Sequence, residues 1–226
     1  MYRIGMNPVS KSTAADAGDA EPAKRSRAAT RNRLLATSAE VFAERGIEGA
    51  SVEELCAAAG FTRGAFYSNF ATKTDLALAM YEEHVRQLEE RLNDQLDHWL
   101  DLGAQDPAAV VERILEGMAD FTSDTVWHAV RLELLLVARR SERVRGVVAE
   151  QRNVLADAVT AALIRVAEDQ NAEFTVDASE LARLLLAVYD GRLNEQIAGG
   201  GSRRAHLNLV SLTWRNLTRP KLRPEP

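Results

Sequence analysis

The segment from Ser51 to Asp75 constrains the fold of this chain more than any other part of the sequence. Ser51 is followed three residues later by Glu54, which is the capping-box pattern of a helix start. Gly60 then interrupts the helical pattern with a residue that tolerates a positive φ, and Thr62 can cap a further short helix. Two short helices joined by a tight glycine turn form a helix-turn-helix.

Helical patterns also flank this motif. A 3.6-residue period begins at Thr30 and ends at Gly46, and Thr72 caps an amphipathic pattern that runs to about Leu100. With 46% hydrophobic but only 6% aromatic residues, the composition favours helices, and the sequence predicts an all-α fold without strands. Further helices are expected from Asp106-Pro107 onward and over about 125–140, 141–170 (with a possible break near Gly146), 178–198 and 205–217.

Charge is distributed unevenly along the chain. The net charge is −5, but residues 1–75 hold 10 Lys/Arg against 9 Asp/Glu (+1), whereas residues 76–226 hold 18 against 24 (−6). Within the first part, a basic run without intervening acids suits an arm that binds phosphates, although such a run taken alone is more often a solvated tail. Its members are Lys24, Arg25, Arg27, Arg31 and Arg33.

The run from Gly60 to Tyr67, followed by Phe70 and Lys73, resembles the TetR family of one-component transcriptional regulators. The resemblance covers the segment from the first helix to the start of the fourth, and it implies that Tyr67 and Lys73 anchor DNA phosphates. The residue types agree, because arginine is the commonest reader of guanine and small residues allow close approach to the duplex. The expected DNA-binding residues are Ser51, Thr62, Arg63, Gly64, Ala65, Tyr67, Ser68, Asn69 and Lys73.

The resemblance further implies a second, helical domain that binds an inducer and dimerises, commonly through its last two long helices. The partners would then be a double-stranded DNA operator, a second copy of the chain and an unidentified small-molecule effector. The candidate effector-binding residues are polar or aromatic side chains inside apolar helices, namely Trp99, Phe121, Trp127, His128, Arg131 and Tyr189. The candidate dimer residues lie on helices with little polar face, namely Leu181, Leu185, Val188, Leu209, Leu212 and Trp214. For each of these residues, an ordinary core position is the alternative.

These patterns divide the chain into four segments. Residues 1–28 lack periodic apolar positions and are expected to be disordered. Residues 29–75 form the expected three-helix DNA-binding domain with its helix-turn-helix. Residues 76–219 form the larger helical domain for effector binding and dimerisation, and residues 220–226 are a tail.

The sequence argues against other classes of function. No histidine follows a glutamate by three residues, as helical di-iron sites require, and neither a phosphate-binding glycine loop nor a Cys/His cluster is present. We therefore expect no enzyme, no metal and no cofactor. The single cysteine, Cys56, is interpreted as a small core residue.

The absence of an apolar stretch of membrane-spanning length or of a secretory signal predicts a cytoplasmic protein. The expected function is a dimeric TetR-type repressor that binds a palindromic operator and is released by a small molecule. The alternative is a helical adaptor that binds a ligand or another protein without binding DNA.

Overall fold

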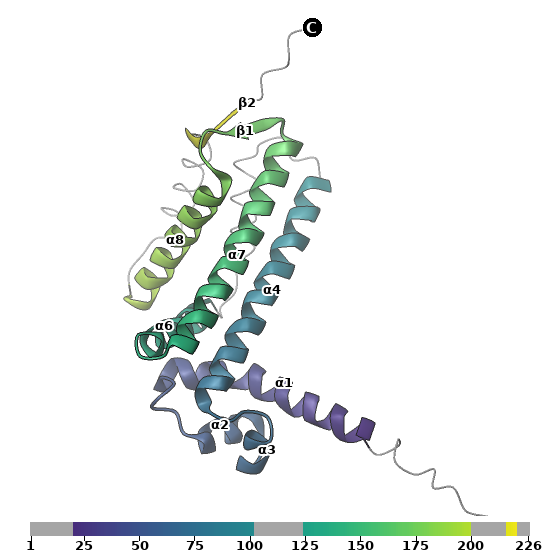
Figure 1. Cartoon of the computed structure of the whole chain (residues 1–226), viewed down its shortest axis with the longest axis vertical. Helices are drawn as coiled ribbons and strands as arrows, with labels where there is room; N and C mark the ends of the chain where they lie inside the picture. Colours follow the sequence, from purple (N-terminus) through teal and green to yellow (C-terminus); the bar gives the residue numbers. More distant parts are fainter. Residues whose placement is uncertain (1–19, 102–123, 200–215, 221–226) are drawn as a thin grey trace, which may run out of the picture.

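A computed structural model describes residues 20–101, 124–199 and 216–220 of the chain (Figure 1). Within these ranges the fold is helical, as the sequence predicts, apart from one short antiparallel pair of strands. The elements are α1 (Ala20–Arg45), α2 (Val52–Ala59), α3 (Arg63–Tyr67), α4 (Lys73–Asp101), α6 (Asp124–Ala138), α7 (Glu142–Asp169), β1 (Ala172–Phe174), α8 (Ala178–Ile197) and β2 (Thr218–Pro220).

The turn between α2 and α3 is built by its own residues. The predicted capping box is present, because the Ser51 hydroxyl accepts from the Glu54 amide at 3.1 Å and the Glu54 carboxylate accepts from the Ser51 amide at 2.8 Å. At the other end of α2, Gly60 has φ +76°. Its amide donates to the Ala57 carbonyl, and the Phe61 amide donates to the Cys56 carbonyl, which together form a Schellman motif. The turn is therefore held by hydrogen bonds within its own segment.

Helix α1 differs from its expected extent. It begins at Ala20, ten residues before the expected start at Thr30, so the end of the segment expected to be disordered is helical. This stretch contains Ala23, Ala28 and Ala29 with interspersed lysine and arginine, which are strong helix formers even without an apolar face. Apolar periodicity alone does not detect such an extension. Residues 1–19 lie outside the described ranges.

The first three helices pack around aromatic and aliphatic side chains. Phe66 and Phe70 of the α3 region meet with ring centroids 6.1 Å apart, and both are buried. They belong to the same apolar cluster as Phe42, Leu55 and Leu76, as the sequence predicts. This packing leaves the opposite side of α3 to the solvent.

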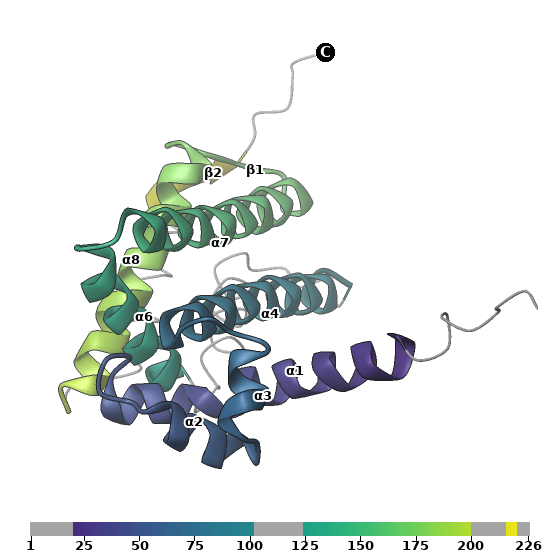
Figure 2. The ribbon, with the colours of Figure 1, turned by 60° about the horizontal axis from the view of Figure 1, so that its bottom comes forward.

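Long helices form the second part of the molecule. Helix α4 leaves the first unit and packs along α7, and α7 packs along α8 (Figure 1). Helix α6 contacts α4, α7 and α8 and also reaches α1 (Figure 2). The core is continuous from α1 to α8, so α4 and α6 both connect the first unit to the long helices.

The structure differs from the expected secondary structure in two details. Strands β1 and β2 pair antiparallel, with Glu173 opposite Arg219, although no strand is expected from the sequence. Each is three residues long, which is too short for an alternating pattern to be recognised. Helix α7 also continues through Gly146 without a break, because the Ser141 cap and its buried face outweigh the roughly 1 kcal/mol cost of one glycine. The helix expected after Asp106 falls outside the described residues, and so does most of the last one.

Within the described ranges, no helix is both long and apolar enough to cross a membrane.

Candidate functional site

The exposed side of α3 forms one continuous surface, here called the α3 surface, at the end of the molecule opposite the paired strands (Figure 1). Thr62 caps α3, its hydroxyl accepting from the Ala65 amide at 3.4 Å. Tyr67 points away from the core, with 52% of its surface exposed. Small, exposed Gly64 leaves the start of the helix open to a close approach. The exposed members of this surface are Thr62, Arg63, Gly64, Tyr67 and Ser68.

Arg63 is held in place within the α3 surface. Its Nη1 lies 2.6 Å from the Glu53 carboxylate of α2, and its guanidinium lies 6.0 Å from the Tyr67 ring centroid. Both partners are exposed, so the ion pair stabilises the fold little and can exchange for a phosphate or a base edge. The side chain is thus oriented at the start of α3 without being buried.

Helix α1 brings two further arginines to α3. The Arg27 guanidinium donates to the Ser68 carbonyl at the end of α3, and the Arg31 guanidinium lies 5.3 Å from the Phe70 ring centroid. Both arginines belong to the basic run found in the sequence, and both are exposed. These two members of the run are therefore positioned beside α3.

Besides Thr62, several of the expected DNA-binding residues form hydrogen bonds within the fold itself. Lys73 donates from Nζ to the carbonyls of Glu48 at 2.8 Å and Ala50 at 2.6 Å, which ties α4 to the loop before α2. The Ser51 hydroxyl caps α2, and the Asn69 amide donates to the Ala65 carbonyl at 2.8 Å. Ala65 itself is half-buried within α3.

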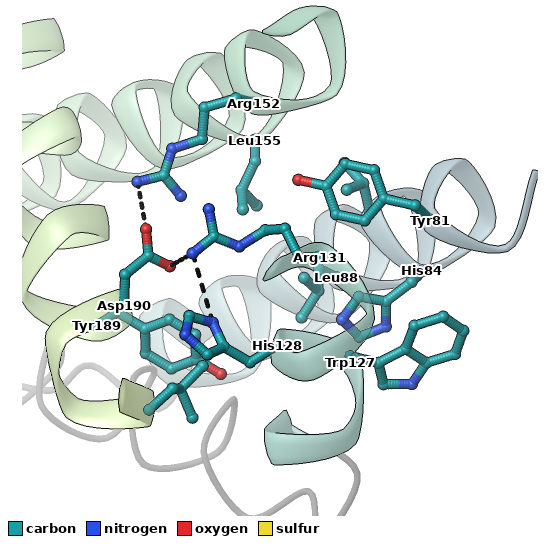
Figure 3. Close-up of a pocket in the computed structure, with 12 residues that line it drawn as sticks. Tyr81, His84, Leu88, Trp127, His128, Arg131, Arg152, Leu155, Tyr189 and Asp190 are labelled. Carbon is teal, nitrogen blue, oxygen red and sulfur yellow. Dashed lines mark hydrogen bonds and ion pairs between the residues drawn. The ribbon is translucent and has the colours of Figure 1, made fainter. Parts of the chain in front are cut away.

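A second candidate site is a partly open cavity among α4, α6, α7 and α8, here called the inner cavity (Figure 3). Its volume is about 50 Å³, enough for a few water molecules or one small chemical group. Its walls are mostly apolar or aromatic. The lining residues are Tyr81, His84, Val85, Leu88, Trp127, His128, Arg131, Arg152, Leu155, Tyr189, Asp190 and Leu193.

An ion-pair network crosses the inner cavity. The Asp190 carboxylate of α8 lies 3.0 Å from Arg131 Nη2 of α6 and 2.9 Å from Arg152 Nη2 of α7 (Figure 3). Arg131 Nη2 also lies 3.4 Å from His128 Nδ1, while His128 Nε2 lies 2.7 Å from Asn194 Oδ1. With a carbonyl-type acceptor at Nε2 and a guanidinium donor at Nδ1, these contacts match the His128 tautomer whose proton is on Nε2.

Aromatic stacking forms another wall of the inner cavity. The ring centroids of His84 and Trp127 lie 4.4 Å apart with an interplanar angle of 9°. Burial, together with the positive charge of Arg91, lowers the pKa of His84 to about 3, so its imidazole is neutral near pH 7. Burial also raises the pKa of Tyr81, whose phenol therefore stays protonated.

The inner cavity unites four of the six side chains expected to bind an effector: Trp127, His128, Arg131 and Tyr189. Trp99 lies near the far end of α4 and is not part of its lining, and Phe121 lies outside the described residues. The other eight lining residues were not predicted from the sequence, and four of them are polar or aromatic, namely Tyr81, His84, Arg152 and Asp190. The sequence does contain a signal for such residues, namely a polar residue at an apolar position of the helical period. Arg152, for example, follows Val148 by four residues and precedes Leu155 by three, so it lies on the same helix face as both.

The expected dimer residues separate into three groups. Leu181 and Leu185 are 2% and 7% exposed, so they belong to the core of the single chain and leave no surface for a partner. Val188 is half-buried, whereas neighbouring Leu184 is 48% exposed. Leu209, Leu212 and Trp214 lie outside the described residues. A continuous apolar pattern does not distinguish the core face of a helix from an exposed face.

Polar contacts link the α3 unit to the long helices. The Ile47 amide in the loop after α1 donates to the Glu133 carboxylate of α6 at 3.1 Å. At the start of α7, the Arg143 guanidinium donates to the Asp75 carboxylate near the start of α4. Glu133 lies two residues after Arg131, so one helix reaches both the inner cavity and the loop before the helix-turn-helix.

The comparisons with known proteins agree with this arrangement. A family model described as bacterial regulatory proteins, tetR family, matches residues 34–80. A second, described as tetracyclin repressor-like, C-terminal domain, matches residues 102–215.

Individual relatives support the same assignment. The chain is 27% identical over 191 residues to the HTH-type transcriptional repressor AcnR of Corynebacterium efficiens, covering 84% of this chain and 94% of AcnR. It is 36% identical over 67 residues to the HTH-type transcriptional repressor NemR of Escherichia coli, covering 30% of this chain and 34% of NemR.

Solved structures share the fold. The crystal structure of reduced E. coli NemR matches with a TM-score of 0.66 and 22% identity, covering 84% of this chain and 98% of that one. A TetR-family transcriptional regulator from Cytophaga hutchinsonii matches with a TM-score of 0.63 and 17% identity, covering 83% and 92%.

Proposed function

Because the chain belongs to the tetR family of bacterial regulatory proteins, it is a transcriptional regulator, and we propose that it is a dimeric repressor released by a small-molecule effector. The α3 surface supports the DNA-binding part of this proposal. It presents Arg63 and Tyr67 outward beside a capped helix start, and α1 adds Arg27 and Arg31 next to it. Such a surface suits phosphates at its rim and base edges at its centre.

A palindromic operator follows from the single helix-turn-helix of each chain. One short recognition helix reads few base pairs, so a two-fold dimer doubles the contact, and its half-sites must repeat at about 34 Å, one turn of DNA. The dimer is a proposal supported by family membership and by exposed Leu184 on α8. We propose no catalytic role and a cytoplasmic location, as for a regulator that works on the chromosome.

Helix α6 offers a physical route for release. Arg131 and Glu133 lie on this helix, so a ligand that moves Arg131 also shifts the carboxylate that holds the Ile47 amide. Changing the tilt of the α3 unit would alter the spacing of the two recognition helices in a dimer. The change in operator affinity cannot exceed the difference in the ligand's binding free energy between the two tilts, which is typically about 1 to 3 kcal/mol.

A gel shift with the DNA upstream of the protein's own gene tests the proposal. We expect specific retardation that Arg63→Ala weakens and that Arg165→Ala leaves unchanged. Arg165 is a matched control, because it also forms an exposed 2.6 Å ion pair, with Asp97, but far from α3. Failure to bind this region, and also a randomised library of DNA sequences, would favour the adaptor alternative.

A further inference from the structure

The inner cavity carries an excess of positive charge, and we propose that it binds the carboxylate group of a small anionic effector. The proposal rests on the effector role given above and specifies the chemical class of that effector. Among the described lining residues, Arg131, Arg152 and Asp190 are the ones that carry a formal charge near neutral pH. Two guanidinium groups therefore face one carboxylate.

The histidines do not alter this balance. The hydrogen bonds of His128 are those of the neutral ring, with Nε2 facing the Asn194 carbonyl oxygen and Nδ1 facing Arg131. His84 is buried against Trp127, and the low pKa that follows from its burial keeps it uncharged. The described lining thus has a formal charge of +1 in a partly buried place, where water screens a charge poorly.

The two arginines retain the capacity to bind a second anion. The contacts to Asp190 use one terminal nitrogen of each guanidinium, Nη2. A guanidinium has five N–H donors in a planar fork that matches a carboxylate. In addition, the Tyr81 hydroxyl points into the cavity toward Arg131 and Leu155 and is a protonated donor (Figure 3).

Size and shape favour a carboxylate over a bulkier anion. The Asp190 carboxylate bridges Arg131 and Arg152, so the two guanidinium groups are spaced to bind a flat three-atom anion, and a second carboxylate would bind their other N–H donors from the cavity side. The cavity of about 50 Å³ admits a group of this size, whereas a drug-sized ligand needs at least about 300 Å³. We expect the rest of a larger effector to extend through the open side.

Three probes of equal shape test the charge preference. Acetate, acetamide and acetamidinium carry −1, 0 and +1 charge, and their effect on the melting temperature of the full chain is measured at constant ionic strength. From the concentration dependence we expect acetate to bind at least tenfold more tightly than the other two. Equal binding of all three, or preference for acetamidinium, would overturn the proposal. Tighter binding of inorganic phosphate than of acetate would contradict the carboxylate class.

Variants locate the bound anion. Arg152→Gln should weaken acetate binding at least fivefold, while Arg165→Gln, which alters an exposed ion pair on the same helix, should not. Asp190→Asn keeps the side-chain shape and removes the competing carboxylate, so its acetate affinity should rise. Unchanged acetate binding in both Arg152→Gln and Asp190→Asn places the anion elsewhere and contradicts the proposal. These titrations contain no DNA, so failed operator binding refutes the repressor function and leaves the anion site standing.

Discussion

At the scale of single residues, the structure distinguishes side chains that are exposed on the α3 surface from side chains that stabilise it through hydrogen bonds. Tyr67 and Lys73 have the same role in the family resemblance, as phosphate anchors. In the structure, Tyr67 is exposed, but the Lys73 ammonium donates to two backbone carbonyls. The motif predicts which residues lie on the DNA-binding side. It does not predict which of their hydrogen-bond donors are already bonded within the protein.

This difference leads to a prediction for Lys73→Ala and Tyr67→Phe. Lys73→Ala leaves the Glu48 and Ala50 carbonyls without their ammonium donor, so it should lower the free energy of unfolding by about 1 to 3 kcal/mol. Tyr67→Phe should change stability by less than about 0.5 kcal/mol, because it alters an exposed hydroxyl. Both should weaken operator binding without changing sequence preference. Urea unfolding and gel shifts measure the two effects, and equal stabilities would refute the structural role of Lys73.

Buried His84 makes stability depend on pH. The pKa of its imidazole is about 3 in the folded chain, against 6.5 for an exposed ring, so the unfolded chain binds the proton more readily. Its contribution is fully present above pH 6.5 and is lost as the pH falls toward 3, by about 1.4 kcal/mol per unit. His84→Phe keeps a flat ring against Trp127, so it should remove the contribution of His84 to the fall in unfolding free energy between about pH 6 and 4. Urea unfolding at several pH values measures this dependence. If the free energy of unfolding falls with decreasing pH equally in wild type and variant, buried His84 does not cause the loss of stability.

At the scale of elements, most of the described structure was predictable from local signals. The capping box at Ser51, the turn at Gly60 and the caps at Thr62, Ser141 and Asp177 fix helix starts within a residue of those expected. The parts of the secondary structure that were not predicted have no local signal in the sequence. The start of α1 has no apolar face, and β1 and β2 exist through pairing between residues distant in the sequence. Four of the twelve residues that line the inner cavity were named from the sequence, because side chains of α4, α7 and α8 converge on it only in the fold.

The contact between α6 and the loop after α1 provides a prediction at this scale. Gly46 has φ +72°, and a Cβ there would approach Glu133 Oε2 to 2.8 Å. Gly46→Ala should therefore cost more stability than Gly60→Ala, which has a similar φ but open space around its Cβ. We expect a difference of about 1 to 3 kcal/mol, since the displaced carboxylate leaves the Ile47 amide unpaired.

A double-mutant cycle isolates this contact. In a Glu133→Ala background the clash is absent, so the cost of Gly46→Ala should fall to that of Gly60→Ala. Thermal or urea unfolding of the variants measures both steps. A cost of Gly46→Ala that is the same with and without Glu133 would show that backbone strain, and not α6, accounts for it.

At the scale of the whole molecule, the single chain leaves some apolar surface uncovered. Helix α8 packs on α7 and α6 and buries Leu181 and Leu185, yet Leu184 on the same helix is 48% exposed. Sequence periodicity cannot assign these leucines, because a helix buried on two sides has apolar residues all around. The structure assigns Leu181 and Leu185 to the core and leaves Leu184 available to a second chain, where the dimer proposed above requires an apolar contact.

The last prediction is that Leu184→Glu dissociates the dimer. A carboxylate buried in an apolar interface without a partner is costly, so the dimer dissociation constant should rise at least tenfold. Leu136→Glu on α6, where the native leucine is 58% exposed, is the matched control and should leave the dimer intact. Sedimentation at micromolar concentration measures both. Because a palindromic operator requires two linked recognition helices, Leu184→Glu should also weaken operator binding while the melting temperature of the monomer stays near that of wild type. Dissociation by Leu136→Glu alone would place the interface on α6, and a monomeric wild type would remove the two-fold mode of operator recognition.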